Sequence, residues 1–227
     1  MKKRLLALAL ASLTLTGCAM MSEKECLNAD WYALGLQDGT DGKNLGYFSQ
    51  RLQACSEHKV AANKSQYLKG HAQGLVSFCN YETGLQQGEY GHTYEGVCQG
   101  SAKDEFMRGY QLGMKTYQLT QTYQSYQNQL VQIDEEIAEH KEEVERLRQE
   151  LKQLNKSVTH FNHSDTKMTY DEFRKIERTR LETERQMQKD MLSYKQAISE
   201  LMQQRDEVLE LIDGSKNDLL RHQNSYR

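Results

Sequence analysis

Residues 130–161 read LVQIDEEIAEHKEEVERLRQELKQLNKSVTHF, and this stretch decides the fold of the chain. Its core-type positions recur three and four residues apart, with charged residues between them. They are Leu130, Ile133, Ile137, His140, Val144, Leu147, Leu151, Leu154, Val158 and Phe161. Such spacing places a stripe along one side of a helix and is typical of a coiled-coil strand. We therefore expect a long helix that buries this stripe against another helix.

The same register continues towards the N-terminus through Tyr126, Tyr123 and Leu119. The helix is therefore expected to begin near Ala102 and to extend for about 80 Å. The tyrosine and glutamine run over residues 117–129 is interpreted as a packing stripe, with a sugar-binding surface as the alternative.

Residues 160–167, HFNHSDTK, are expected to interrupt this helix, and Thr169 with Glu172 forms a capping-box pattern that begins a second one. The second helix carries its own stripe with steps of four and three residues. Its members are Met187, Met191, Tyr194, Ile198, Leu201, Arg205, Val208, Ile212, Ser215 and Leu219. Two helices of similar length with a short connection predict an antiparallel hairpin.

The second stripe weakens over residues 176–187, where Leu181 is nearly the only aliphatic residue. An antiparallel pairing would then leave Val144, Leu147 and Leu151 partly uncovered. One interpretation is a local stutter that repairs the register. The other is a groove for a helix of a partner or of a second copy. The groove hypothesis predicts that Val144→Asp abolishes partner capture and changes thermal unfolding little.

The first half of the chain repeats a different pattern, in which an aromatic residue is followed by glycines three and seven positions later. The copies are Tyr32 with Gly35 and Gly39, Tyr67 with Gly70 and Gly74, Tyr81 with Gly84 and Gly88, and Phe106 with Gly109 and Gly113. Glycines four apart share one helix face, where a second backbone can approach closely. We expect close helix packing there. For residues 38–42, DGTDG, a turn is preferred over a packed helix or a calcium loop.

Four cysteines lie in this half: Cys26, Cys55, Cys79 and Cys98. An even number in an exported chain indicates two disulfides, for which three connectivities are possible. We favour Cys26 with Cys55 and Cys79 with Cys98, because each pair then brackets one segment. Each bridge would stabilise the fold by about 3 kcal/mol in the chain-entropy model.

A zinc site is the alternative, because His58 follows Cys55 closely and His71 precedes Cys79. The chain lacks a Cys-x-x-Cys knuckle, however, and an oxidising compartment disfavours thiolate ligands. No zinc or other cofactor is therefore expected. Trp31, the only tryptophan, is expected to fill a small core.

The cysteine and glycine framework over residues 22–115 resembles the domain of unknown function numbered 2799. The matching residues are Cys26, Asp30, Trp31, Gly35, Asp38, Gly39, Cys55, Tyr67, Gly70, Gly74, Cys79, Gly84, Gly88, Tyr94, Cys98, Phe106, Gly109 and Tyr110. This family occurs in bacterial lipoproteins and is uncharacterised, so the resemblance implies an envelope location and no catalytic residue. The long helical extension lies outside the resemblance.

The N-terminus carries an export signal. Residues 2–4, KKR, are basic, and residues 5–15 form an apolar run too short to span a bilayer permanently. Residues 15–18, LTGC, resemble the bacterial lipobox, which implies cleavage before Cys18 and a lipid on its sulfur. Stable anchoring needs about two acyl chains. Because Ala19 follows where aspartate would favour retention in the inner membrane, we expect the outer membrane.

The predicted organisation is a signal peptide over residues 1–17, a lipidated tether over 18–24, a disulfide-bonded helical domain over 25–115 and a coiled-coil hairpin over 116–227. The expected fold class is all-α. The formal charge of −3 becomes −6 once the three basic signal residues are removed. This acidic balance argues against nucleic-acid binding.

No nucleophile elbow, His-Glu-x-x-His or phosphate-loop motif occurs in the sequence. We therefore expect a non-catalytic interaction or scaffold protein, anchored to the membrane by lipid, that contacts a protein partner or itself through the coiled coil. A self-associating structural component and a cell-wall-directed enzyme are the alternatives. His140, at a core-type position, is interpreted as setting the register, with a pH switch as the alternative.

Overall fold

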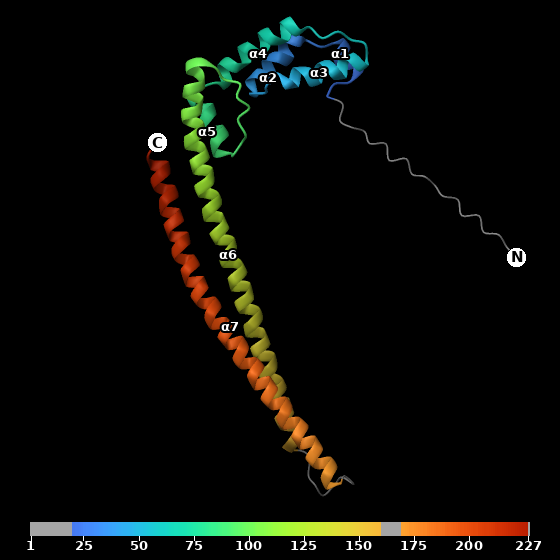
Figure 1. The fold of residues 1–227 in the computed structure, drawn as a ribbon, viewed down its shortest axis with the longest axis vertical. Coiled ribbons are helices and arrows are strands. Elements are labelled where there is room, and N and C mark those ends of the chain that lie inside the picture. The colour runs from blue at the N-terminus through green and yellow to red at the C-terminus, as the bar shows by residue number, and fades with distance from the viewer. Residues whose placement is uncertain (1–19, 160–168, 227) are drawn as a thin grey trace, which may run out of the picture. The chain divides into compact units, whose positions relative to one another are not determined.

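The computed structural model describes residues 20–159 and 169–226. These residues form helices joined by short connections, and they contain no β-strand. The helices are α1 (Glu23–Leu27), α2 (Trp31–Thr40), α3 (Gly46–Glu57), α4 (Lys64–Phe78), α5 (Tyr81–Glu89), α6 (Gly100–Thr159) and α7 (Tyr170–Asn224) (Figure 1). The expectation of an all-α fold is confirmed.

The chain divides into two compact units, Met1–Tyr117 and Gln118–Arg227. The division falls within two residues of the boundary expected after residue 115. Helix α6 is continuous across it, so its first turns belong to unit 1 and the rest to unit 2. Among the described residues, no helix combines the length and apolarity needed to cross a bilayer.

In unit 1, α2 packs against α4 through glycines on both helices. A β-carbon at Gly35 would lie 2.1 Å from the Tyr67 carbonyl oxygen, and one at Gly70 would lie 2.0 Å from that of Tyr32. Such distances leave no room for any side chain, so only glycine permits this approach. The close packing expected from the glycine spacing is therefore confirmed for this pair.

Helices α5 and α6 repeat the same arrangement. A β-carbon at Gly84 would lie 2.1 Å from the Phe106 carbonyl oxygen, and one at Gly109 would lie 2.1 Å from that of Tyr81. The aromatic residue that opens each pattern thus supplies the carbonyl on which the opposite glycine packs. Unit 1 is built from two glycine-paired helix pairs, α2 with α4 and α5 with α6.

The first helix of each pair is followed by the same kind of turn. Gly42 after α2 and Gly91 after α5 both have φ of +68°, a left-handed conformation that favours glycine. Each lies against an aromatic ring, Phe78 for Gly42 and Tyr117 for Gly91, leaving no space for a β-carbon. These rings follow the second glycine of α4 and of α6 by four residues. The equivalence identifies an internal duplication with matched spacing.

Two apolar cores lie in unit 1. The first consists of Met21, Cys26, Trp31, Phe48, Ala54, Cys55 and Tyr67, and the second of Phe78, Cys79, Cys98 and Phe106. Trp31 is 7% exposed and meets Phe48 edge to face, which confirms its expected core position. Because these cores are small, cross-links are an efficient source of stability.

Each core holds one disulfide. Cys26 is bonded to Cys55, and Cys79 is bonded to Cys98. This is the connectivity that the sequence favours. Both bridges close a segment that leads from one helix of a pair towards the other.

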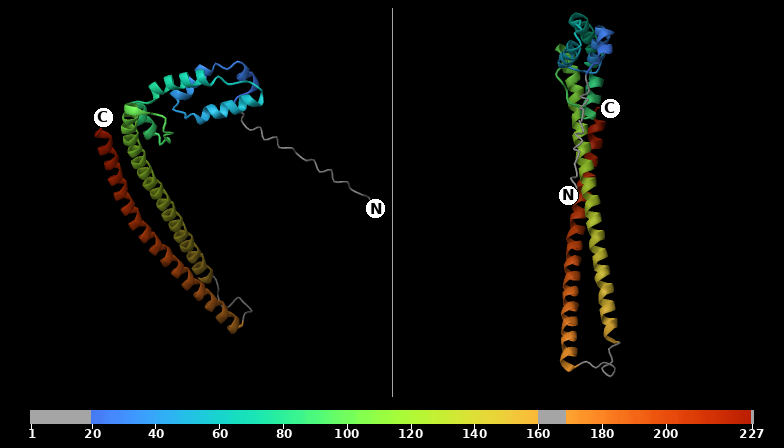
Figure 2. Two further views of the ribbon diagram at one scale, coloured as in Figure 1. Left: turned by 45° about the horizontal axis from the view of Figure 1, so that its top comes forward. Right: turned by 90° about the vertical axis from the view of Figure 1, so that its right-hand side faces the viewer.

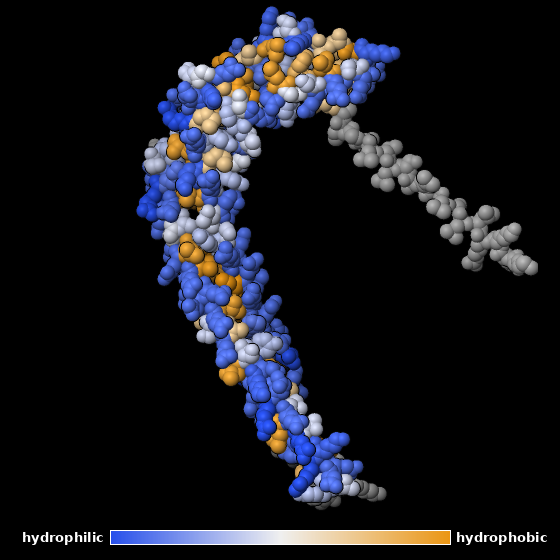
Figure 3. Space-filling view, in the orientation of Figure 1, coloured by the Kyte–Doolittle hydropathy of each residue, from blue (hydrophilic) through white to orange (hydrophobic). Residues whose placement is uncertain are grey.

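In unit 2, α6 and α7 lie side by side in antiparallel directions (Figure 2). Ile137, Val144 and Leu147 of α6 and Leu201 and Val208 of α7 are buried, as the two stripes predict. On the surface of the hairpin, separate hydrophobic patches lie among mostly hydrophilic residues (Figure 3). The expected hairpin is confirmed.

Helix α7 begins as its sequence predicts. The Thr169 side chain accepts a hydrogen bond from the backbone N–H of Glu172, whose carboxylate accepts one from the N–H of Thr169. This is the expected capping box. The break expected over residues 160–167 lies outside the described residues.

Candidate functional site

The most deeply buried charged group of unit 1 is the carboxylate of Asp38 in α2, which is 3% exposed. Arg51 of α3 donates to both carboxylate oxygens, with Nε 2.8 Å from Oδ2 and Nη2 2.7 Å from Oδ1. The hydroxyl of Tyr67 in α4 also donates to Oδ2, at 2.7 Å. One carboxylate therefore ties together three helices.

These contacts shift the pKa values of Asp38 and Tyr67. Burial alone would raise the pKa of Asp38, but the hydrogen bonds from Arg51 and Tyr67 and the nearby positive charge outweigh it and lower that pKa. Burial, followed by the hydrogen bond to Asp38, raises the pKa of Tyr67 far above its ordinary value. Asp38 is thus held ionised and Tyr67 neutral.

This cluster has the properties of a structural ion pair. Three hydrogen bonds, two of them from a bidentate arginine, engage both oxygens of the carboxylate within the fold and fix its geometry. The same engagement disfavours the calcium-loop alternative for residues 38–42. The turn interpretation was wrong for Asp38 and Gly39, which lie inside α2, because Gly39 packs on the His71 backbone and continues the helix interface.

The zinc alternative also loses its ligands, because all four cysteines form disulfides. His71 is buried and its Nε2 lies 2.7 Å from the Lys43 carbonyl oxygen. Tyr110 takes the equivalent place in the second helix pair, where its hydroxyl donates to the His92 carbonyl at 2.8 Å. Since a tyrosine replaces the histidine in the duplicate, His71 serves to hold the turn after α2.

Unit 2 is held by polar contacts between its helices as well as by its apolar seam. Arg205 of α7 pairs with Asp134 of α6 at 2.7 Å, and the ring of His140 lies 5.3 Å from that of Tyr194. His140 is half-buried at the seam, as the register interpretation requires. These contacts fix how residues of α6 align with residues of α7.

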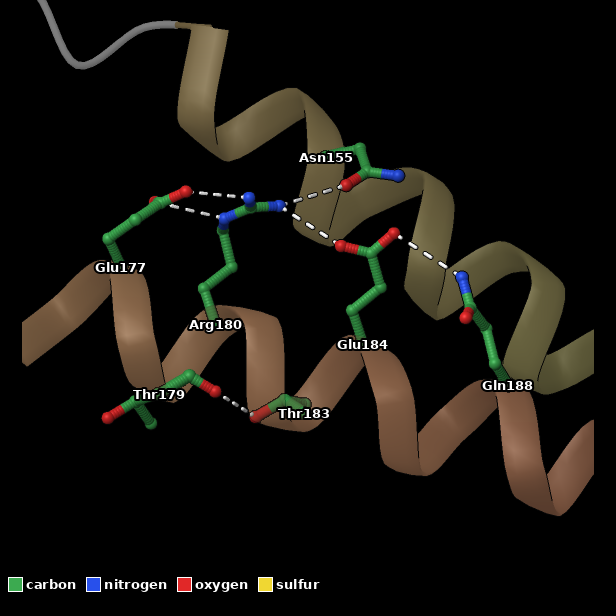
Figure 4. A network of polar contacts seen from close by, with 7 residues as sticks. All are labelled: Asn155, Glu177, Thr179, Arg180, Thr183, Glu184 and Gln188. Carbon is green, nitrogen blue, oxygen red and sulfur yellow. Dashed lines mark hydrogen bonds and ion pairs between the residues drawn. The ribbon is translucent and has the colours of Figure 1, made fainter.

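The weak part of the second stripe is filled by a polar cluster (Figure 4). Arg180 pairs with Glu177 at 2.7 Å and with Glu184 at 3.3 Å, and its Nη1 also donates to Asn155 Oδ1 of α6 at 3.4 Å. The Arg180 side chain is only 17% exposed. A long side chain whose stem is covered thus takes the place of an aliphatic seam residue.

The groove expected at Val144, Leu147 and Leu151 is not open. Val144 and Leu147 are each 6% exposed, and Leu151 is half-buried. The physical reason is the alignment of the helices. Because Asn155 faces Arg180 and His140 faces Tyr194, Val144 and Leu147 lie opposite the part of α7 that contains Met187 and Met191. Methionine adapts its shape well to such positions.

The hairpin nevertheless exposes apolar residues outside its seam. Val131 is 56% exposed, Leu192 58%, Met202 52% and Leu211 47%. They are distributed over both helices, with polar and charged residues between them in the sequence. The apolar surface that the hairpin exposes therefore lies at these separate positions and not at the seam.

The proposed lipidation site, Cys18, and the signal over residues 1–17 lie outside the described residues. The Asp38 cluster, in contrast, is well described but was missed by sequence analysis. Its three members stand 13 and 29 positions apart, and no local pattern connects them. An acidic residue at a helix position beside two interface glycines was the one available signal.

A family model with the description "Protein of unknown function (DUF2799)" matches residues 30–115, which is less than half of the chain. Comparisons with curated proteins and with solved structures give no match. The matched residues cover α2 to α5 and the first turns of α6, including all eight interface glycines. This glycine-paired part of the chain is therefore similar to the DUF2799 family.

Proposed function

We propose that this chain is a lipid-anchored lipoprotein of the bacterial outer membrane, and that it acts by protein contact through its helical hairpin. The observation that carries the proposal is the hairpin itself. Its helices contain 60 and 55 residues, and they bury their own seam while exposing Val131, Leu192 and Met202. A long element with a satisfied interior and exposed anchors is suited to presenting a surface to another protein.

Support for the anchor comes from the order of signals along the chain. A basic segment, a short apolar segment and the residues LTGC precede a domain that is cross-linked by two disulfides. Stable disulfides are typical of exported proteins, so the signal and the cross-links point to one compartment. A lipid on Cys18 would hold the chain at a membrane without a spanning helix.

The anchor is tested by replacing Cys18 with serine and fractionating the cells. The proposal expects the wild-type protein in the outer-membrane fraction, with an intact mass that includes acyl chains starting at residue 18. It expects Cys18→Ser to lack the added mass and to leave that fraction. Equal outer-membrane recovery of both forms, without an acyl mass, would contradict lipid anchoring.

The contact is tested by co-purification from solubilised membranes. The proposal expects one reproducible partner with the wild-type chain and its loss in the double variant Leu192→Glu with Met202→Glu. Both side chains are more than half exposed, so the double variant is expected to remain folded. Recovery of the same partner with the double variant, or of the chain alone, would count against the proposed contact; self-association alone would support the structural alternative.

A further inference from the structure

Helix α4 has a second apolar face in addition to the one that packs on α2. Leu68, Ala72, Leu75 and Val76 follow steps of four, three and one, which places them on one side of the helix. Ala72 and Val76 are exposed, and Val76, at 71%, is the most exposed large apolar residue described. Leu68 packs against the first core and Leu75 against the second, so the uncovered part of this face is Ala72 and Val76.

The internal duplication provides a control for this observation. Gly70 of α4 corresponds to Gly109 of α6, so the equivalent face of α6 carries Met107, Gln111, Met114 and Lys115. Two of those four positions are polar. The helix-pair architecture therefore does not require an apolar face here, and the one on α4 calls for another explanation.

This face forms one wall of a cavity of about 700 Å³ within unit 1. Leu45, itself 48% exposed, and Val97 supply apolar surface on the other side, and the Cys79–Cys98 disulfide also lines the cavity. A volume of a few hundred to about 1,000 Å³ with mainly apolar walls is characteristic of small-molecule sites. The cavity lies at the junction of the two helix pairs.

The charges of the residues that line the cavity indicate which class of ligand it can bind. Among the described residues that line the cavity, Glu95 and His71 are the ones with an acidic or basic side chain, and none is lysine or arginine. One Glu95 oxygen, Oε2, accepts the backbone N–H of Asn44 at 3.0 Å, which holds the carboxylate at the cavity. His71 Nε2 is engaged by the Lys43 carbonyl. An apolar cavity with one fixed carboxylate is complementary to an apolar molecule that ends in a positive charge.

We infer that this cavity is a binding site for a cationic amphiphile, with its apolar chain along Leu68, Leu75 and Val76 and its ammonium group at Glu95. The inference concerns unit 1 alone and is independent of the proposed contact through the hairpin. Burial of exposed apolar surface on α4 supplies the driving force, and the carboxylate selects the charge of the head group.

The test uses the mature chain with Cys18→Ser, so that no detergent competes, and titrates it with decylammonium below its aggregation concentration. Binding is followed by NMR. The inference expects saturable shifts at Leu68, Leu75, Val76 and Val97. It expects decanoate, which has a chain of similar length and the opposite charge, to bind at least about tenfold more weakly.

Two pairs of variants locate the site. Glu95→Gln keeps an oxygen for the Asn44 N–H and is expected to weaken decylammonium binding about three- to tenfold, while Glu82→Gln, outside the cavity, leaves it unchanged. Val76→Ser is expected to weaken binding, and Leu27→Ser, which is also highly exposed, is not. Equal binding of decanoate, insensitivity to Glu95→Gln, or no saturable binding would each overturn the inference.

Discussion

Gly70 of α4 packs directly on the carbonyl oxygen of Tyr32 in α2, so closely that a β-carbon at residue 70 would stand 2.0 Å from that oxygen. The obstacle is backbone, which cannot rotate aside as a side chain can. Gly70→Ala is therefore expected to separate α2 from α4 and to destabilise unit 1 by about 3 kcal/mol or more. Urea unfolding, followed through the fluorescence of Trp31, measures this loss.

Gly214 in α7 is the matched control, because a β-carbon there would meet nothing within 4 Å. Glycine in a helix interior costs up to about 1 kcal/mol relative to alanine. Gly214→Ala is thus expected to raise the stability of the hairpin by roughly that amount. If both substitutions changed stability in the same direction, close backbone packing would not explain the interface glycines.

The ion pair of Asp38 makes unit 1 sensitive to acid. The pKa of Asp38 is lowered in the folded chain, so its contribution is present above the ordinary carboxyl value, about 4, and is lost as pH falls through the folded pKa. Unit 1 of the wild-type chain is expected to lose stability steeply below about pH 4. Trp31 fluorescence against pH at fixed urea measures the transition.

Asp38→Asn isolates this contribution, because the amide cannot titrate and leaves the partly buried Arg51 without its counter-charge. Breaking a buried pair in this way costs about 3–5 kcal/mol, so the variant is expected to be less stable at pH 7. Its stability should also vary less between pH 5 and pH 3 than that of the wild type. If the stability of the wild type and that of Asp38→Asn changed with pH in parallel, Asp38 would be excluded as the source of the acid sensitivity.

Val144 and Val131 are a matched pair on α6, since one is 6% and the other 56% exposed. Val144→Asp places a charge in the seam and is expected to lower hairpin stability by about 3 kcal/mol or more. Val131→Asp is expected to change it by less than about 0.5 kcal/mol. Circular dichroism at 222 nm during thermal unfolding measures both effects. If Val144→Asp left the stability of the hairpin unchanged, the hypothesis of an open groove at Val144 would be supported again, against the observed burial.

Each disulfide encloses the first helix of one pair, Cys26 with Cys55 around α2 over a separation of 29 residues and Cys79 with Cys98 around α5 over 19. Replacing either pair with serines is expected to cost unit 1 about 3 kcal/mol in the chain-entropy model. The hairpin lies in unit 2 and should keep its own transition. Urea unfolding curves with and without reductant measure this loss of stability. A loss confined to the hairpin would contradict the assignment of the two disulfides to the stability of unit 1.

Much of this architecture could be predicted from local sequence. The steps of three and four residues in α6 and α7 predict the seam, because helical periodicity alone decides which side is buried. The capping box at Thr169 predicts the start of α7 for the same local reason. The glycine spacing likewise predicts close helix packing, and the cysteine order favours the observed disulfides.

The errors arise where distant residues determine the outcome. The groove at Val144 failed because the alignment of α6 with α7 depends on particular cross-helix contacts, such as Asn155 with Arg180. A periodic pattern does not contain that alignment. The polar cluster around Asp38 was missed because a buried charge depends on partners that only the folded chain brings together, here Arg51 and Tyr67.

Photo-crosslinking in living cells tests the proposed contact most directly, with the crosslinker placed in turn at Leu192, Met202 and Leu201 of α7. The first two are more than half exposed, whereas Leu201 is 9% exposed and serves as the buried control. A discrete adduct with one other envelope protein is expected from Leu192 or Met202, and none from Leu201. Adducts only between copies of this chain, or none at either exposed position, would contradict the proposed contact.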